Sequence, residues 1–446
     1  MARMVWPRSI LQRVQKASMS PPTRCTCAIR LDPIERARES QPRISLLSLR
    51  TALQSGREAQ VSESAAALGD SARRAFDLRV RPTEARIDAH ALSHNFREAR
   101  RAAPRSRVMG VVKADGYGHG AAIAAKAFLE AGADWLGVAL VEEGLALRNL
   151  GITAPILVLG GQYTDYGLLL QHRLTPLVYR PDMLDQLAAA ARQRGVAADA
   201  HLKLDTGMGR IGALPEELPG LIAHLRGRPE VRITGLCSHF ANADLRDPTA
   251  TRLAMELFVE GRRALLDAGQ PLQLSHLANS AATLDLPSSH HDMVRPGLML
   301  YGAVPAPRFA GLADLKPAMS WVTGISHLKH VPAGTPISYG HCWTARRDSV
   351  IATLPIGYAD GYRRSLTNKA EALLGGRRVK QVGTVCMDMM MIDATDVPGA
   401  RLGDEVVLLG EQGGERITAQ DLADLCDTIP YELFCAIGAR VPRVPV

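Results

Sequence analysis

Short apolar runs alternate with amphipathic segments from about residue 81 to residue 310. The first run, VMGVVKA at 108–114, predicts a buried strand, and AAIAAKAFLEAG at 121–132 predicts a helix that ends at a glycine. Further strands are predicted along the same region, at 135–140, 155–161, 175–180, 201–205, 233–240, 274–277 and 293–302. Because strands that alternate with helices form parallel βαβ units, and about eight such units close into a ring, the pattern predicts an α/β fold with a (β/α)8, TIM-like barrel. A doubly wound open sheet is the alternative, and the lack of a G-x-G-x-x-G motif after the first strand argues against it.

The pattern changes beyond residue 310. Apolar runs at 318–331, 349–362, 378–396 and 403–410 are split by glycine and proline turns, which predicts strands. The next strong helical pattern is ITAQDLADLC at 417–426. The chain is therefore divided into an N-terminal extension, a barrel and a mainly β C-terminal domain, at residues 1–80, 81–310 and 311–446.

The composition is typical of a soluble globular enzyme, with 46% apolar and 22% charged residues in a chain of 446. No apolar run approaches the length that spans a bilayer, so no membrane partner is expected. The seven cysteines form neither a disulfide framework nor a metal-ligand pattern. This usage indicates a reduced, cytoplasmic compartment and predicts no metal site.

The net charge of +8 belongs mostly to the first 80 residues. They carry 14 Lys and Arg against seven Asp and Glu, whereas the rest of the chain carries 39 against 38. The body is therefore nearly neutral, which argues against nucleic acid as a partner. Residues 1–31 have no acidic residue and no secretory-type apolar core, superficially like an organellar transit peptide. A disordered tail, or a translation start assigned too far upstream, is the simpler interpretation.

Lys113 lies where the first predicted strand gives way to a glycine-rich turn, in VVKADGYGHG at 111–120. A lysine at the mouth of a buried strand is poorly solvated, so its amine is more readily neutral and can form a Schiff base with an aldehyde cofactor. Gly116, Gly118 and Gly120 let the backbone approach a ligand closely, which suits a phosphate. A surface lysine that caps a strand is the alternative for any single lysine.

Two further basic side chains follow a later strand. KLDTGMGRIG at 203–212 places Lys203 and Arg210 around a glycine turn, and a guanidinium at a barrel mouth can bind a carboxylate or phenolate through two hydrogen bonds. The alternatives are a surface salt bridge for Arg210 and a buried pair with a carboxylate for Lys203. His239 ends the strand in SHFANAD, where a satisfied core histidine is the more common role.

Small and polar residues follow the last strands of the barrel region. Asn279 and Ser280, in HLANSAA, stand at a predicted helix start, where N–H groups and a hydroxyl favour a phosphate; an ordinary N-cap uses the same residues. RPGLMLYG places Arg295 just before Gly297. In the C-terminal domain, PISYGH places Tyr339 at a glycine bend that can project its hydroxyl.

These motifs, in this order, resemble those of alanine racemases over about residues 81–446. The resemblance implies pyridoxal 5'-phosphate as the cofactor, with Lys113 as its covalent partner, Tyr117, Ser280 and Gly297 at its phosphate, and Arg295 at its pyridine nitrogen. A guanidinium can only donate to that nitrogen, so the ring stays a weaker electron sink and a proton returns quickly. The family also implies that ARIDAH, near residue 85, is a strand that pairs with the C-terminal domain.

The resemblance further implies roles around the substrate. Arg210 would steady the substrate carboxylate and the phenolic oxygen of the cofactor, and Lys203 matches a position that is carbamylated in many relatives. His239 would bind the cofactor-facing arginine and link it with the catalytic tyrosine. Racemisation needs a proton removed from one face of Cα and delivered to the other, so Lys113 and Tyr339 fit as a pair of bases.

Residues of the C-terminal domain complete the expected site. CMDMMM contributes Met387 and Asp388, and GYADGY contributes Tyr358 and Asp360. Taken singly, each is more simply a structural residue. Together they resemble the substrate contacts and the entryway of the family. By resemblance, Tyr339 and Met387 reach the cofactor of the other subunit. The active unit is therefore expected to be a head-to-tail homodimer whose active sites are shared between subunits.

The resemblance thus implies a racemase that interconverts L- and D-alanine, with supply of D-alanine for peptidoglycan, or degradation of one enantiomer, as its expected use. Ala439 stands where some relatives have a gate-forming tyrosine, so a wider gate and a racemase of broader specificity form one alternative. A non-catalytic pyridoxal-phosphate-binding protein is another, disfavoured because it would need no second base such as Tyr339. A decarboxylase on the same barrel is the last, disfavoured by the SYG and CMD motifs.

Overall fold

The computed structural model describes residues 80–160 and 165–446, of which Arg81–Val446 belong to one structural unit. The predicted extension at 1–80 therefore lies outside the described residues, apart from Val80.

Eight parallel strands form one sheet in the order β9-β2-β3-β4-β5-β6-β7-β8. They are β2 (Arg107–Val111), β3 (Trp135–Val138), β4 (Ile156–Val158), β5 (Leu174–Val178), β6 (Ala198–Lys203), β7 (Val231–Cys237), β8 (Leu274–His276) and β9 (Met293–Val294). The two outer strands also meet, because the N–H of Asp292 donates to the carbonyl of Ser275 at 3.1 Å. The predicted barrel is confirmed, nearly closed, and the open-sheet alternative is wrong.

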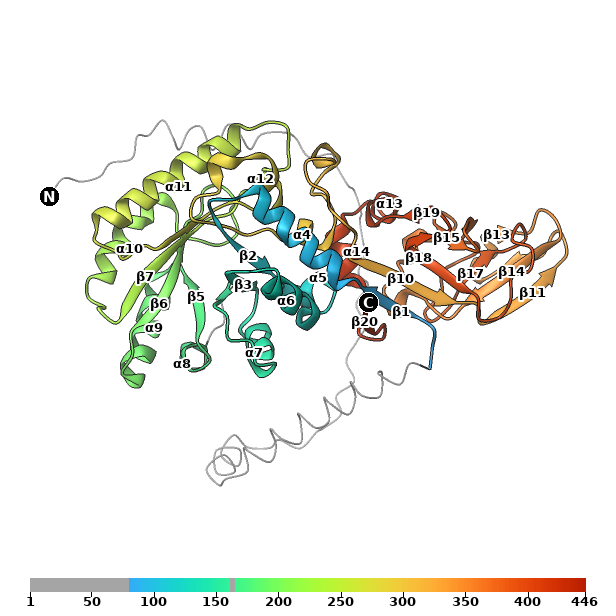
Figure 1. Ribbon diagram of the computed structural model, residues 1–446, viewed down its shortest axis with the longest axis horizontal. Coiled ribbons are helices and arrows are strands. Elements are labelled where there is room, and N and C mark those ends of the chain that lie inside the picture. The colour runs from blue at the N-terminus through green and yellow to red at the C-terminus, as the bar shows by residue number, and fades with distance from the viewer. Residues whose placement is uncertain (1–79, 161–164) are drawn as a thin grey trace, which may run out of the picture. The chain divides into compact units, whose positions relative to one another are not determined.

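Helices cover the outside of the barrel (Figure 1). They are α4 (Ala89–Ala102), α6 (Ala121–Glu130), α7 (Val141–Asn149), α8 (Tyr166–Gln171), α9 (Pro181–Arg194), α10 (Leu218–Leu225) and α11 (Thr249–Asp267). Two short elements, α5 (Lys113–Tyr117) and α12 (Ser280–Asp285), follow β2 and β8 at the ends of those strands. Helix α9 shows how the sequence sets the ends: it begins at a proline, and Gly195, in the left-handed conformation, caps it after its last residue. The structure adds α4, which the apolar pattern alone did not identify.

Short 3-10 helices form many of the remaining turns. They are η1 (Pro215–Glu217), η2 (Pro287–Ser289), η3 (Leu298–Tyr301), η4 (Pro307–Phe309), η5 (Tyr339–His341), η6 (Tyr358–Asp360) and η7 (Arg364–Leu366). Among the described residues, no helix combines the length and apolar character needed to cross a bilayer.

The region after the barrel is mainly β, as predicted. Its strands are β10 (Met319–Gly324), β11 (His327–Val331), β12 (Pro336–Ile337), β13 (Trp343–Thr344), β14 (Ser349–Leu354), β15 (Glu371–Leu374), β16 (Arg377–Lys380), β17 (Met390–Asp393), β18 (Glu405–Gln412), β19 (Glu415–Ile417) and β20 (Arg443–Pro445). The main sheet has the order β16-β15-β18-β10-β1-β20, and β11-β14-β17 and β12-β13 form smaller sheets. Two helices follow, α13 (Ala419–Leu425) and α14 (Pro430–Ala436).

The strand expected near residue 85 is β1 (Glu84–Ile87), at the start of the described chain. It pairs antiparallel with β10, with Ala85 opposite Trp321, and parallel with β20. The chain therefore contributes a strand to the C-terminal sheet before it enters the barrel, and this prediction is confirmed.

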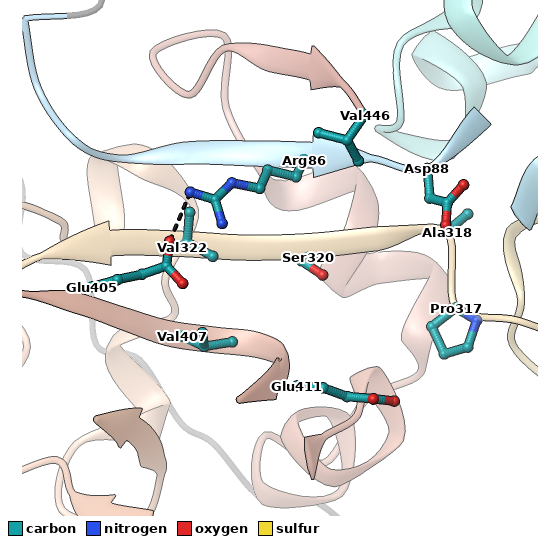
Figure 2. Close-up of a pocket in the computed structure, with 10 residues that line it drawn as sticks. All are labelled: Arg86, Asp88, Pro317, Ala318, Ser320, Val322, Glu405, Val407, Glu411 and Val446. Carbon is teal, nitrogen blue, oxygen red and sulfur yellow. Dashed lines mark ion pairs between the residues drawn. The ribbon is translucent and has the colours of Figure 1, made fainter. Parts of the chain in front are cut away.

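A hollow of about 180 Å³ lies on the face of this sheet (Figure 2). Its charged groups are already paired: Arg86 binds Glu405 at 2.7 Å, Asp88 caps α4 by accepting from the N–H of Ala91, and Glu411 binds Arg416. The hollow contains none of the candidate site residues, and we interpret its polar lining as structural.

Candidate active site

The predicted basic side chains lie at one end of the barrel, where its strands end. Lys113 follows β2, Lys203 ends β6, His239 follows β7 and Arg295 follows β9. Arg210 lies in the loop after β6. Because the carboxyl ends of parallel barrel strands share one rim, and TIM-barrel active sites lie there, these side chains form a candidate active site.

The turn that follows Lys113 is left-handed. Ala114, Asp115, Gly116 and Tyr117 all have φ between 52° and 61°, and Gly118 has φ 75°. This conformation costs a non-glycine residue roughly 1–2 kcal/mol, so neighbouring contacts must hold the turn. The glycines of VVKADGYGHG predict a turn here, but they do not predict that it is left-handed.

Contacts with the C-terminal region hold the far end of this turn. Arg443 donates from Nε to the carbonyl of Gly118 at 2.9 Å. A Cβ atom at position 118 would lie 2.1 Å from the carbonyl oxygen of Phe434 in α14, so only glycine fits this approach. The rim is therefore packed against α14.

Lys113 is half-buried, and its surroundings favour the neutral amine. Burial lowers the pKa of Lys113, and the positive charges of Arg210 and Arg295 lower it further, whereas Glu143 and Cys435 act in the opposite direction. A neutral amine is the form that attacks a carbonyl. The environment therefore supports the nucleophilic role inferred from the sequence.

Ser280, Gly297 and Tyr117 form a polar cradle beside the rim. The Ser280 hydroxyl accepts from the N–H groups of Gly297 at 2.9 Å and Met299 at 3.3 Å, which leaves its proton free to donate. A Cβ atom at position 297 would lie 2.3 Å from the Tyr117 hydroxyl, so glycine is required there. Burial raises the pKa of Tyr117, which remains a donor. Among the described residues, neither the Ser280 nor the Tyr117 hydroxyl donates a hydrogen bond, and two such donors suit an anion such as phosphate.

Asn279 caps a helix, which is one of the two roles that its position predicted; the other was phosphate binding. Its side-chain oxygen accepts from the N–H of Ala282 at 3.1 Å, at the start of α12. This contact fixes the backbone next to Ser280.

Arg295 is buried and held by hydrogen bonds to its neighbours. Its Nη1 donates to Nδ1 of His276 at 2.8 Å, and its Nη2 donates to the Ser238 carbonyl at 2.6 Å. His239 Nδ1 lies 3.4 Å from the same Nη2. Burial, and then the charge of Arg295, keep the pKa of both histidines well below its usual value, so both are neutral near pH 7.

A second hydrogen bond links His276 to another buried histidine, His201. Because Nδ1 of His276 accepts from Arg295, its Nε2 carries the proton and donates to Nδ1 of His201 at 2.8 Å. His276 was not among the residues predicted from the sequence, although LSH places a histidine at a strand end as SHF does for His239.

Lys203 is only 4% exposed. Its Nζ donates to the carbonyl of Leu204 at 3.0 Å, and within residues 80–160 and 165–446 it forms no salt bridge. Burial lowers the pKa of Lys203. The alternative of a buried lysine–carboxylate pair therefore finds no support. Asp205 instead shapes the loop to Arg210, accepting from three successive N–H groups, the first that of Gly207 at 3.0 Å.

Tyr339 and Met387 lie elsewhere on this chain, in the C-terminal β region. Their exposed fractions are 73% and 53%. In the described part of the chain, the Tyr339 hydroxyl has no hydrogen bond to the barrel residues Lys113, Arg210 or His239. One chain therefore assembles the barrel half of the expected site and leaves these two residues at the surface.

The loop of Tyr339 is nevertheless tightly held. Ser338 and His341 have φ of 68° and 47°. Thr384 secures the loop, because its hydroxyl donates to the Tyr339 carbonyl at 2.7 Å while its own carbonyl accepts from Ser338 at 2.7 Å. Tyr339 is thus an exposed side chain on a fixed backbone.

Two other residues of the C-terminal region have structural roles. Asp360 is fully buried and binds Arg81 at 2.8 Å and Arg440 at 3.4 Å, so it is not open to an entryway. Asp388 is exposed and binds Arg440 at 2.8 Å. Together these ion pairs tie Arg81, near the start of the described residues, to the segment before β20.

Comparisons with known proteins agree with this architecture. The model of the alanine racemase N-terminal domain matches residues 87–305, and that of the alanine racemase C-terminal domain matches residues 318–445. An alanine racemase of Symbiobacterium thermophilum is 47% identical over 367 residues, covering 82% of this chain and 97% of that protein. One from Halothermothrix orenii is 45% identical over 366 residues, with the same coverage.

Solved structures give the same result. The alanine racemase of Streptomyces lavendulae superposes with a TM-score of 0.79 at 38% identity, covering 82% of this chain and 97% of that one. The biosynthetic alanine racemase of Pseudomonas aeruginosa superposes with a TM-score of 0.73 at 39% identity, covering 82% and 100%. With both domains matched in order across the described body, the chain belongs to the alanine racemase family.

Proposed function

We propose that this chain is a pyridoxal-phosphate-dependent alanine racemase that interconverts L- and D-alanine. The observation that carries this function is the half-buried Lys113 at the barrel rim, with a lowered pKa and with Arg295 nearby, in a chain of the alanine racemase family. The activity would supply D-alanine for peptidoglycan. The five cysteines among the described residues are free thiols, which supports a reducing, cytoplasmic location.

The residues at the rim fit pyridoxal phosphate, the cofactor of this family. Lys113 would hold its aldehyde carbon, Ser280 and Tyr117 would donate to its phosphate beside Gly297, and Arg295 would donate to its ring nitrogen. When bound, the cofactor withdraws electrons from the substrate and so acidifies the hydrogen on Cα. The close approach of the Tyr117 hydroxyl to Gly297, and a Ser280 hydroxyl that accepts hydrogen bonds but donates none within the described residues, are the observations that support this fit.

Two bases would move the proton on Cα. Lys113 would act on one face and Tyr339 on the other, so that a proton lost from one side is returned from the opposite side. Arg210 would bind the substrate carboxylate through two hydrogen bonds. Carbamylation of Lys203 would give that buried side chain a negative charge, which would orient Arg210.

We also infer that the active unit is a homodimer in which Tyr339 and Met387 complete the site of the other subunit. Their high exposure supports this assembly, as does the rigid backbone of Tyr339. Exposed Tyr358 and Met389 add further apolar surface to the same region. A second copy would remove this surface from water and supply the base that one chain lacks at its rim.

The first test is an assay of the purified full-length protein with L-alanine in deuterated water. Loss of optical rotation together with deuterium uptake at Cα is expected. Reduction with borohydride should then fix the cofactor to the peptide that contains Lys113. Turnover of lysine, arginine or serine without turnover of alanine would replace the proposal with a racemase of broader specificity, and absence of bound cofactor would refute it.

The role of Tyr339 has its own test. We expect Tyr339→Phe to abolish racemisation almost completely while the cofactor remains bound, because only the hydroxyl is removed from an exposed loop. An unchanged rate would contradict the two-base mechanism.

A further inference from the structure

Glu143 joins the turn after Lys113 to the neighbouring strand. It lies in the first turn of α7, which follows β3. One carboxylate oxygen accepts from the N–H of Ala114 at 2.6 Å. The other accepts from the N–H groups of Ala139 at 2.7 Å and Leu140 at 3.1 Å. The residue directly after Lys113 is thus fixed by the same carboxylate that begins α7.

The chemistry of this junction favours a carboxylate. Ala114 begins the left-handed turn, so its N–H needs a partner from outside the turn. Three N–H donors converge on Glu143, and an ionised carboxylate offers acceptors on both of its oxygens. Glutamine would place its NH2 group against one set of these donors. The charge also makes the hydrogen bonds short and strong.

We propose that Glu143 is the positioning residue of Lys113, fixing the left-handed turn so that the amine stays at the rim and providing the carboxylate charge that acts on it. The inference deepens the proposed function, on which it rests, since it assigns the group that holds the proposed cofactor-binding lysine in place. Sequence alone gave no sign of this role, because an acidic residue in the first turn of a helix is common.

Charged and titratable groups reach Lys113 from every element packed around it: Glu143, Arg210, His239, Arg295 and Cys435. Among these, Glu143 is the carboxylate, and it raises the pKa of Lys113 against the effect of the two arginines. Loss of its charge therefore lowers that pKa. Lys113 must be neutral when it removes a proton, so the acid limb of kcat moves to lower pH.

The test compares three variants of the full-length enzyme as isolated. Glu143→Gln removes the charge and one acceptor, and Glu143→Asp keeps the charge but shortens the reach. Glu142→Gln is the matched control, because Glu142 is the adjacent, exposed acid of the same helical turn. The readouts are amide hydrogen exchange in residues 113–120, kcat and KM for alanine, the pH profile of kcat, and the thermal unfolding midpoint.

For Glu143→Gln we expect exchange in 113–120 to be roughly tenfold faster and kcat to be roughly 10- to 100-fold lower, with KM changed less than threefold. The acid limb should move down by about one pH unit. Glu143→Asp should keep the acid limb in place and recover part of kcat, and Glu142→Gln should match the unaltered enzyme throughout.

Two outcomes would overturn the inference. One is that Glu143→Gln matches Glu142→Gln in exchange and kcat. The other is that Glu143→Gln loses kcat only together with its thermal midpoint, with the acid limb unmoved, which would make Glu143 a merely structural residue. If the unaltered chain does not racemise alanine, the proposed function fails, and the exchange comparison alone then decides whether Glu143 fixes the turn.

Discussion

Position 297 shows how one residue type controls the proposed phosphate cradle. The Tyr117 hydroxyl occupies the space that a side chain would need, 2.3 Å from a Cβ atom built there. We expect Gly297→Ala to displace Tyr117, to weaken binding of pyridoxal phosphate by roughly tenfold, and to lower the free energy of unfolding by about 1–3 kcal/mol. Cofactor titration and urea unfolding measure the two effects.

Gly220→Ala is the control for this substitution. Gly220 lies in α10, and a Cβ atom there meets nothing within 4 Å. Alanine should therefore stabilise that helix slightly and leave cofactor binding unchanged. Equal cofactor affinity in both variants would show that Tyr117 and Gly297 do not form the cradle.

Lys203 presents a second question at the scale of one residue. Lys203 is buried near Arg210 and Arg295 and forms no salt bridge within the described part of the chain, so a charge on it carries an uncompensated free-energy cost. Its lowered pKa favours the neutral amine, which is the form that reacts with carbon dioxide. We expect a carbamate signal in carbon-13 NMR of protein equilibrated with labelled bicarbonate near pH 7.5.

The matching variant is Lys203→Met, which keeps an unbranched side chain of similar length. It should lose the carbamate signal and raise KM for alanine by roughly tenfold, since Arg210 would lose a charged partner. A signal that persists in Lys203→Met would assign the carbamate to another lysine.

Single residues also show where sequence reasoning succeeds and where it stops. The positions of Lys113, Lys203 and Arg295 at the rim could be predicted, because apolar runs reveal where barrel strands end and strand ends converge. The groups that bind or orient these residues could not be predicted from the sequence. Glu143 and His276 act through contacts between distant segments, which no local pattern records.

At the scale of elements, the barrel strands could be predicted from the sequence, whereas helix α4 could not. Barrel strands are buried on both faces and read as apolar runs, so their number and order could be predicted. Helix α4 is half polar: its buried apolar residues Ala91, Leu92, Phe96 and Ala99 recur at helical spacing on one face, and arginines and histidines occupy much of the rest. Asp88 caps it, but two of these four residues are alanines and no continuous apolar run marks the helix, so the sequence signal is weak.

The junction of β1, η6 and the segment before β20 depends on Asp360. This fully buried carboxylate binds Arg81 and Arg440 and also accepts from the N–H of Gly357 at 3.0 Å. We expect Asp360→Asn to lower the free energy of unfolding by about 3 kcal/mol, because it leaves Arg81 without its counter-charge. Urea unfolding followed by fluorescence measures this loss.

Asp396→Asn is the matched control. Asp396 binds Arg347 in an ion pair exposed on both sides, where water screens the charges. That variant should unfold at the same urea concentration as the unaltered protein. If both substitutions had the same effect, the burial of Asp360 would not explain its contribution.

At the scale of the whole molecule, buried histidines set the response to acid. Burial lowers the pKa of His119 to about 4 and that of His201 to about 3. Both are neutral when folded, whereas the unfolded chain takes up their protons near pH 6.5. The folded state is therefore stable above pH 6.5 and loses stability as the pH falls towards 4.

Urea unfolding between pH 7.5 and 4.5 tests this expectation. The midpoint should fall steadily below pH 6.5, and His201→Gln should flatten the fall even if it destabilises the protein overall. His330→Gln, at an exposed position, should leave the slope as it was. A slope unaffected by His201→Gln would place the acid sensitivity in other groups.

The proposed homodimer predicts that two inactive variants restore activity to each other when they are mixed. If each site takes Lys113 from one chain and Tyr339 from the other, neither Lys113→Ala nor Tyr339→Phe can be active alone. In a mixed dimer, however, one site combines Lys113 of the Tyr339→Phe chain with Tyr339 of the Lys113→Ala chain and is intact. The other site contains both substitutions. Random re-association of equal amounts gives one half mixed dimers, so about one quarter of the full activity should return.

The experiment mixes the two inactive variants, dissociates and re-forms the dimers, and compares the rate with each variant treated in the same way. Recovery near one quarter requires that Tyr339 act across the interface. If each site instead took Lys113 and Tyr339 from the same chain, every site would lack one of the two bases. Mixing would then restore no activity. The exposure of Tyr339 on a fixed loop, away from the rim of its own barrel, leads us to expect the recovery.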